Sequence, residues 1–102
     1  MNKLQQFLVS EGETVLTSMK KLDDNAHKIL FVIDKSEELI GSITDGDIRR
    51  WILGGNELSA EVRNVCNNSP IFVSENYLDL EIKDLMLTKN IECIPVLSSD
   101  KI

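Results

Sequence analysis

Thr44 and Asp47 are the residues of this sequence whose types and spacing best fit a binding site. Thr44 ends the apolar run 39–44, and Asp47 begins a run of helical periodicity. A strand ending at Thr44 and a helix starting at Asp47 would bring a hydroxyl and a carboxylate to one point. An ionised carboxylate only accepts hydrogen bonds, which suits the 2′- and 3′-hydroxyls of a ribose, and the threonine hydroxyl can donate or accept at the same sugar. The pair is therefore a candidate ribose site.

The start of the same helix offers groups for a phosphate. A helix N-terminus carries unpaired N–H groups and a partial positive charge. Either Arg49 or Arg50 would add a bidentate partner for that phosphate. Consecutive residues on a helix point in different directions, so we expect at most one of the two arginines to face the ligand. The candidate ligand-binding residues are Thr44, Asp45, Asp47, Arg49 and Arg50.

A purely structural interpretation of residues 44–47 stands beside this one. In it the four residues form a turn from strand to helix, and Asp45 or Asp47 accepts a hydrogen bond from the first free backbone N–H groups. Gly46 would then take a positive φ. The sequence leaves both interpretations open.

The elements around this run form a repeating order. Apolar spacing predicts a helix over 14–22, with Val15, Met19 and Leu22 on one face. Strands are predicted over 7–9, 28–34 and 39–44, and a helix over 47–53 is closed by Gly54-Gly55. The order is therefore strand, helix, strand, strand, helix, in which a pair of helices packs on a small sheet. A further short helix is predicted with Leu58, Val62 and Val65 on one face.

Much of this unit recurs about 64 residues later. A brief strand over 71–73, a helix over 77–86 and a strand over 91–98 match the first three elements of the unit. We therefore expect an α/β (α+β) chain of two repeats, residues 1–66 and 67–102. The second repeat is expected to be truncated at its C-terminal end, because its counterpart of residues 41–50 would fall beyond Ile102. Pro70 and Pro95 are expected to be structural, Pro95 at a sheet edge or bulge.

Composition narrows the classes of function. The 102 residues are 42% hydrophobic and 27% charged, with a net charge of −6 and few clustered basic residues. This balance argues against a nucleic-acid partner, because binding phosphates along a strand needs a concentrated positive surface. No apolar run approaches the roughly 20 residues of a membrane span. The first ten residues are too polar for a signal peptide, so a cytoplasmic location is expected.

The sequence offers little for catalysis. Cys66 and Cys93 stand apart in apolar surroundings and are predicted to be buried structural thiols. With His27 the only histidine, the sequence predicts no metal site. Neither a nucleophile–base pair nor a glycine-rich phosphate loop is evident, so the chain is predicted not to be an enzyme by itself.

The run LIGSITDGDIRR (39–50), with Asn-Ser-Pro at 68–70 and Ile-Pro-Val at 94–96, resembles a tandem cystathionine-β-synthase (CBS) domain pair, also called a Bateman module. The resemblance covers nearly all of the chain and is strongest over 39–50. Two departures are the missing Thr-x-x-Asp of the second copy and Cys66, where the family more often has Met.

This resemblance implies a regulatory function. Thr44 and Asp47 match the Thr-x-x-Asp with which such pairs bind adenosyl nucleotides, so AMP, ADP, ATP or S-adenosylmethionine is the implied regulatory ligand and no cofactor is required. CBS pairs commonly dimerise through their helices, and the apolar face around Ile48, Trp51 and Ile52 predicts a homodimer.

The run Thr-Asp-Gly-Asp-Ile-Arg-Arg (44–50), with residues 51–65 after it, also resembles the CBS pairs that precede sugar-phosphate nucleotidyltransferase domains. A pair that begins at Met1 favours such a parent, with the catalytic domain covalently attached on the C-terminal side. CBS pairs of sugar-phosphate isomerases of the arabinose-5-phosphate type are similar and remain an alternative. A ligand-free oligomerisation module is a further alternative.

Overall fold

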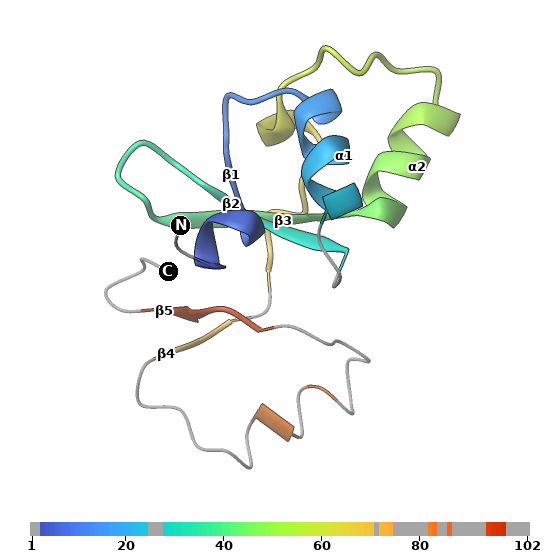
Figure 1. Ribbon diagram of the computed structural model, residues 1–102. Coiled ribbons are helices and arrows are strands. Elements are labelled where there is room, and N and C mark those ends of the chain that lie inside the picture. The colour runs from blue at the N-terminus through green and yellow to red at the C-terminus, as the bar shows by residue number, and fades with distance from the viewer. Residues whose placement is uncertain are drawn as a thin grey trace.

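The computed structural model describes residues 3–24, 28–70, 72–74, 82–83, 86 and 94–97. After a 3-10 helix at Lys3–Phe7, the chain forms β1 (Leu8–Ser10), α1 (Val15–Asp24), β2 (Ile29–Ile33), β3 (Leu39–Thr44) and α2 (Asp45–Leu53). The predicted order of strand, helix, strand, strand, helix is confirmed. Both helices lie on the same side of the sheet (Figure 1).

The three strands form one sheet in the order β1-β2-β3. β1 and β2 are parallel because α1 carries the chain back between them, and Val9 lies opposite Val32. β2 and β3 are antiparallel, with Ile29 opposite Thr44. The central strand β2 is apolar throughout, as a strand covered by helices requires. This arrangement places Thr44 at the end of an edge strand, directly before α2.

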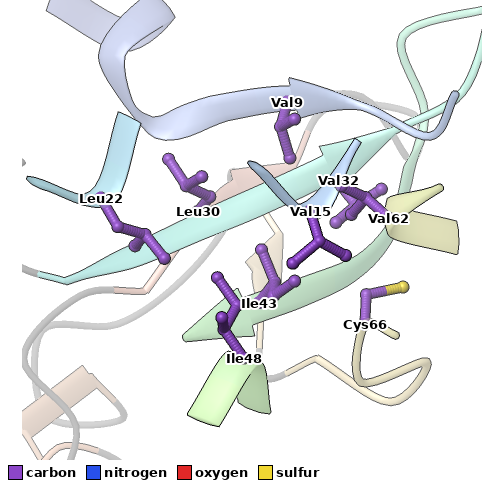
Figure 2. Close-up of a cluster of buried hydrophobic side chains, with 9 residues drawn as sticks. All are labelled: Val9, Val15, Leu22, Leu30, Val32, Ile43, Ile48, Val62 and Cys66. Carbon is purple, nitrogen blue, oxygen red and sulfur yellow. The ribbon is translucent and has the colours of Figure 1, made fainter. Parts of the chain in front are cut away.

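The core lies between the helices and the sheet. α1 buries Val15, Ser18 and Leu22, and α2 buries Ile48. Met19 is only partly buried, so two of the three residues expected on the buried face of α1 are in the core. Figure 2 shows the cluster, whose buried members are Val9, Val15, Leu22, Leu30, Val32, Ile43, Ile48, Val62 and Cys66.

The segment after α2 covers the start of α1. The first backbone N–H groups of α1, from Val15 and Leu16, donate to the carbonyls of Ala60 and Leu58 at 2.9 and 3.1 Å. These carbonyls are therefore not used in a helix of their own. The short helix expected around Leu58–Val65 is reduced to one 3-10 turn at Val62–Asn64, so that prediction was wrong in extent.

The same segment then pairs with the edge of β3. The backbone groups of Ser42 and Asn67 exchange two hydrogen bonds, of 3.0 and 2.8 Å. Gly41 lies against this contact: a Cβ there would be 2.7 Å from both Asn67 O and Cys66 Sγ. The residues that lead into the second repeat are thus held on the sheet of the first.

A second, two-stranded sheet repeats part of the first. β4 (Val73–Ser74) and β5 (Val96–Leu97) are parallel, with Val73 opposite Val96. Both partners stand 64 positions after Val9 and Val32, which face each other in the first sheet. The two sheets therefore share one pair of equivalent positions at the offset found in the sequence. The two repeats, 1–66 and 67–102, stay a prediction.

Other expectations for the second repeat are met only in part. In the predicted helix 77–86, the structure describes Ile82, Lys83 and Met86, which are helical, and the rest of that helix lies outside the described residues. Pro95 is buried directly before β5 rather than within a strand. His27 and Cys93 lie outside the described residues. Within the described ranges, no helix is long and apolar enough to cross a membrane.

Candidate functional site

The start of α2 is built by Thr44 and Asp47. Thr44 is the N-cap in an extended conformation, and its Oγ1 accepts a hydrogen bond from the Asp47 N–H at 3.2 Å. The Asp47 carboxylate reaches back to accept from the Thr44 N–H at 3.0 Å. This reciprocal pair is a capping box, which satisfies two backbone donors that the helix would otherwise leave free.

The capping box corrects part of the turn interpretation. The helix begins at Asp45, two residues earlier than predicted, so Gly46 lies within its first turn. Among the described glycines only Gly55 has a positive φ, and the expectation for Gly46 was wrong. The capping acceptor is the Thr44 hydroxyl rather than a carboxylate of Asp45. The expected stop at Gly54-Gly55 is confirmed, since α2 ends at Leu53 with Gly54 as its C-cap and Gly55 has a positive φ.

The Asp47 carboxylate carries further contacts. Its Oδ2 also accepts from Thr44 Oγ1 at 3.1 Å, and its Oδ1 accepts from Arg50 Nη2 at 2.9 Å. The side chain is 21% exposed, whereas that of Arg50 is 67% exposed. Asp47 is thus a fixed carboxylate that solvent still reaches.

The other two candidate residues, Asp45 and Arg49, face a different place. Both line a cleft of about 450 Å³ between α1 and α2. The expectation that the two arginines diverge agrees with this arrangement, because Arg49 lines the cleft while Arg50 contacts Asp47. The structure therefore brings Thr44, Asp47 and Arg50 together and places Asp45 and Arg49 apart from them.

The cleft contains polar residues that the sequence did not single out. Asp23 from the end of α1 and Lys28 before β2 add one charge of each sign. Asp23 follows Met19 by four positions, a helical spacing that places both on one face and would have identified it. The remaining lining residues are apolar: Met19, Ile48, Ile52 and Leu53.

Trp51 and Cys66 have structural surroundings. Trp51 is partly buried against the core, and its Nε1 donates to the Glu57 carbonyl at 2.7 Å. Cys66 is buried, as predicted. Burial raises the pKa of its thiol, a backbone hydrogen bond opposes this, and the Asp47 charge adds to the increase. A raised thiol pKa keeps the reactive thiolate scarce at neutral pH.

The residues that form this fold and its capping box match a known family. A model of the CBS domain matches residues 4–54, the stretch from the N-terminal 3-10 helix to the end of α2 that includes Thr44 and Asp47. This chain belongs to the CBS domain family. The family expected from the run 39–50 is thereby confirmed, and with it the mixed α/β fold.

Solved CBS structures share this fold over most of the chain. The CBS domains of a transcriptional regulator from Streptococcus pneumoniae give a TM-score of 0.79 at 20% identity, covering 96% of this chain and 80% of that one. A CBS domain protein from Pyrobaculum aerophilum, complexed with AMP, gives 0.77 at 16% identity, covering 96% and 79%. At such identities the likeness concerns the fold.

Among curated proteins, this CBS chain is similar to arabinose 5-phosphate isomerase GutQ of Salmonella typhi. The identity is 26% over 87 residues, which make up 85% of this chain and 27% of that protein. The CBS chain thus spans about a quarter of the length of the curated relatives it matches. The relative corresponds to the isomerase alternative, and these comparisons give no support to a nucleotidyltransferase parent.

Proposed function

We propose that this CBS chain is a regulatory module that binds an adenosyl nucleotide through Thr44 and Asp47. The observation that carries the proposal is the Asp47 carboxylate, which is fixed by the capping box at the start of α2 and is still 21% exposed. A carboxylate held in place by its own backbone loses little conformational freedom when it binds a sugar. The AMP complex of the Pyrobaculum aerophilum relative supports an adenosyl ligand.

In this proposal each part of the nucleotide meets a different feature of α2. The ribose hydroxyls donate to Asp47, and the Thr44 hydroxyl lies beside them. The free N–H groups and positive end of the α2 dipole favour a phosphate nearby. Arg50, which already reaches the start of the helix, is the nearer of the two arginines for that phosphate. Asp45 and Arg49 line the other cleft, so we give them a secondary part in ligand binding.

We further propose that the module regulates an enzyme acting on a sugar phosphate. The similarity to arabinose 5-phosphate isomerase supports an isomerase parent. The sequence resemblance to CBS pairs of nucleotidyltransferases, with an attached C-terminal catalytic domain, is kept as the alternative. Both parents use a sugar phosphate, and in both the CBS module would act by shifting a conformational equilibrium that the catalytic domain reads.

The nucleotide proposal is tested by a thermal shift with AMP, ADP, ATP and S-adenosylmethionine. A ligand at a hundred times its dissociation constant stabilises the folded state by about 2.7 kcal/mol. For a chain of 102 residues this corresponds to an increase in the unfolding temperature of roughly 10 to 20 °C. At least one of the four should give such an increase. A flat response to all four would favour the ligand-free interaction module instead.

We also propose a homodimer through the CBS helices. The face expected from the sequence needs correction, because Ile48 is 4% exposed and belongs to the core. The apolar side chains left on α2 are Ile52 and Leu53, which are 43% and 78% exposed. Burying this surface against a second copy would remove apolar area from water.

Light scattering at tens of micromolar protein should therefore give about twice the monomer mass of 11.5 kDa. Leu53→Asp should shift the mass toward the monomer, since it places a charge in the proposed interface. Ser36→Asp, which adds the same charge in the exposed turn between β2 and β3, should not. A monomeric wild-type protein, or equal masses for the two variants, would contradict an interface at Leu53.

A further inference from the structure

The acceptor capacity of Asp47 is almost fully used without a ligand. A carboxylate offers about four lone-pair positions on two oxygens. Oδ2 accepts from the Thr44 N–H and from Thr44 Oγ1, and Oδ1 accepts from Arg50 Nη2. About one position is left, whereas two ribose hydroxyls that donate together need two. One of the three present donors must therefore leave before a ribose diol can bind in full.

Arg50 is the donor that leaves at the lowest cost. The Thr44 N–H is a backbone group at the end of β3, and an unpaired backbone donor is costly. The Thr44 hydroxyl also caps α2, so its rotation is constrained by that contact. The Arg50 side chain is 67% exposed, and water can solvate its guanidinium once it leaves. Exposed ion pairs of this kind are weak.

The position of Arg50 also depends on Gly46. A Cβ built at Gly46 would lie 3.2 Å from Arg50 Nη1 and 3.5 Å from Nη2. The guanidinium thus lies across the first turn of α2 in space that a side chain at position 46 would crowd. Glycine at this position lets the long side chain fold back from the last turn of the helix to the carboxylate at its start.

We propose that Arg50 is a latch that competes with the ribose for Asp47. The inference rests on the proposed nucleotide function. It adds a residue that weakens the binding of the sugar, because its guanidinium must first leave Asp47. When the sugar binds, its hydroxyls take the acceptor positions of Oδ1 and the guanidinium moves into solvent or toward the phosphate. Arg50 is therefore a positioning residue whose removal should strengthen the binding of a bare nucleoside.

Adenosine is the probe that isolates this effect, because it has no phosphate for an arginine to bind. Calorimetric titration of Arg50→Gln with adenosine should give an affinity two- to fivefold higher than that of the wild-type protein, as expected for the loss of one exposed ion pair. Lys35→Gln is the matched control. It removes the same charge from the exposed turn between β2 and β3, and should leave the adenosine affinity unchanged.

The outcomes separate the latch from the nucleotide proposal. Adenosine affinity in Arg50→Gln that equals or falls below that of the wild type, while the wild type binds AMP, overturns the latch alone. An equal gain in both variants also overturns it, since the effect would then come from net charge. If no protein of the three binds adenosine or AMP, the proposed function is overturned and the latch with it. Unfolding midpoints of the variants show that each is folded.

Discussion

Replacing Asp47 with alanine is expected to weaken AMP binding between tenfold and a hundredfold. The substitution would remove the charge-assisted hydrogen bonds proposed between Asp47 and the ribose, and the loss of even one such bond, of about 1.5 to 3 kcal/mol, accounts for a change of this size. It also leaves the Thr44 N–H without its carboxylate partner, which should lower the free energy of unfolding by about 1 kcal/mol. Isothermal titration calorimetry measures the affinity, after circular dichroism has shown that the variant is folded.

Asp45→Ala is the matched control for this experiment. Asp45 is the first residue of α2 and lines the cleft between the helices, away from the capping box. Removing its carboxylate should change AMP affinity less than threefold. It should lower the free energy of unfolding by only a few tenths of a kcal/mol, because one negative charge is lost at the positive end of the helix dipole. Thr44→Val tests the hydroxyl separately. Equal AMP affinity in the wild type and Asp47→Ala would mean that residues 44–47 only cap a helix.

Gly41→Ala is expected to lower the free energy of unfolding by about 3 kcal/mol. The added methyl group would be 2.7 Å from the Asn67 carbonyl oxygen and from Cys66 Sγ. The carbonyl cannot move aside freely, because it accepts the Ser42 N–H at 3.0 Å. A loss of this size is a large fraction of the 5 to 15 kcal/mol typical of a folded domain. Urea denaturation should show a lower midpoint.

Gly12→Ala separates this close approach from the general effect of removing a glycine. A Cβ at Gly12 would lie 3.4 Å from the end of the flexible Arg63 side chain, an ordinary contact. The free energy of unfolding of the control should therefore lie within about 0.5 kcal/mol of that of the wild type. A small increase is also expected, because alanine restricts the unfolded chain more than glycine does. Equal midpoints for Gly41→Ala and Gly12→Ala would show that the sheet edge adjusts to a side chain at position 41.

The predictions from sequence succeeded where a pattern is local or repeats itself. The strand β3 matches its predicted bounds, and α1 and α2 lie where apolar spacing placed them, because that spacing fixes which face of a helix packs on the sheet. The offset of 64 between Val9 and Val73 followed from comparing two similar stretches of sequence.

The predictions failed where distant segments decide the local structure. Residues around Leu58 have helical spacing, but their carbonyls pair with the first N–H groups of α1, more than 40 positions away in the sequence. No periodicity indicates such a partner. At the site, the sequence showed that Arg49 and Arg50 diverge. It could not show which of them reaches Asp47, because that depends on the rotation of α2 against the sheet and on the space above Gly46.

The pairing of Ser42 with Asn67 ties the proposed site to the segment that runs between the two sheets. Ser42 stands two residues before the threonine that caps α2, and Asn67 belongs to the segment that leads toward β4. A coupling free energy between two sites is reciprocal. Suppose that a nucleotide at Asp47 shifts the end of β3 and favours one position of this segment by a given free energy. A parent enzyme that holds the segment in that position then strengthens nucleotide binding by the same free energy. The ladder of two hydrogen bonds would then carry a signal in both directions.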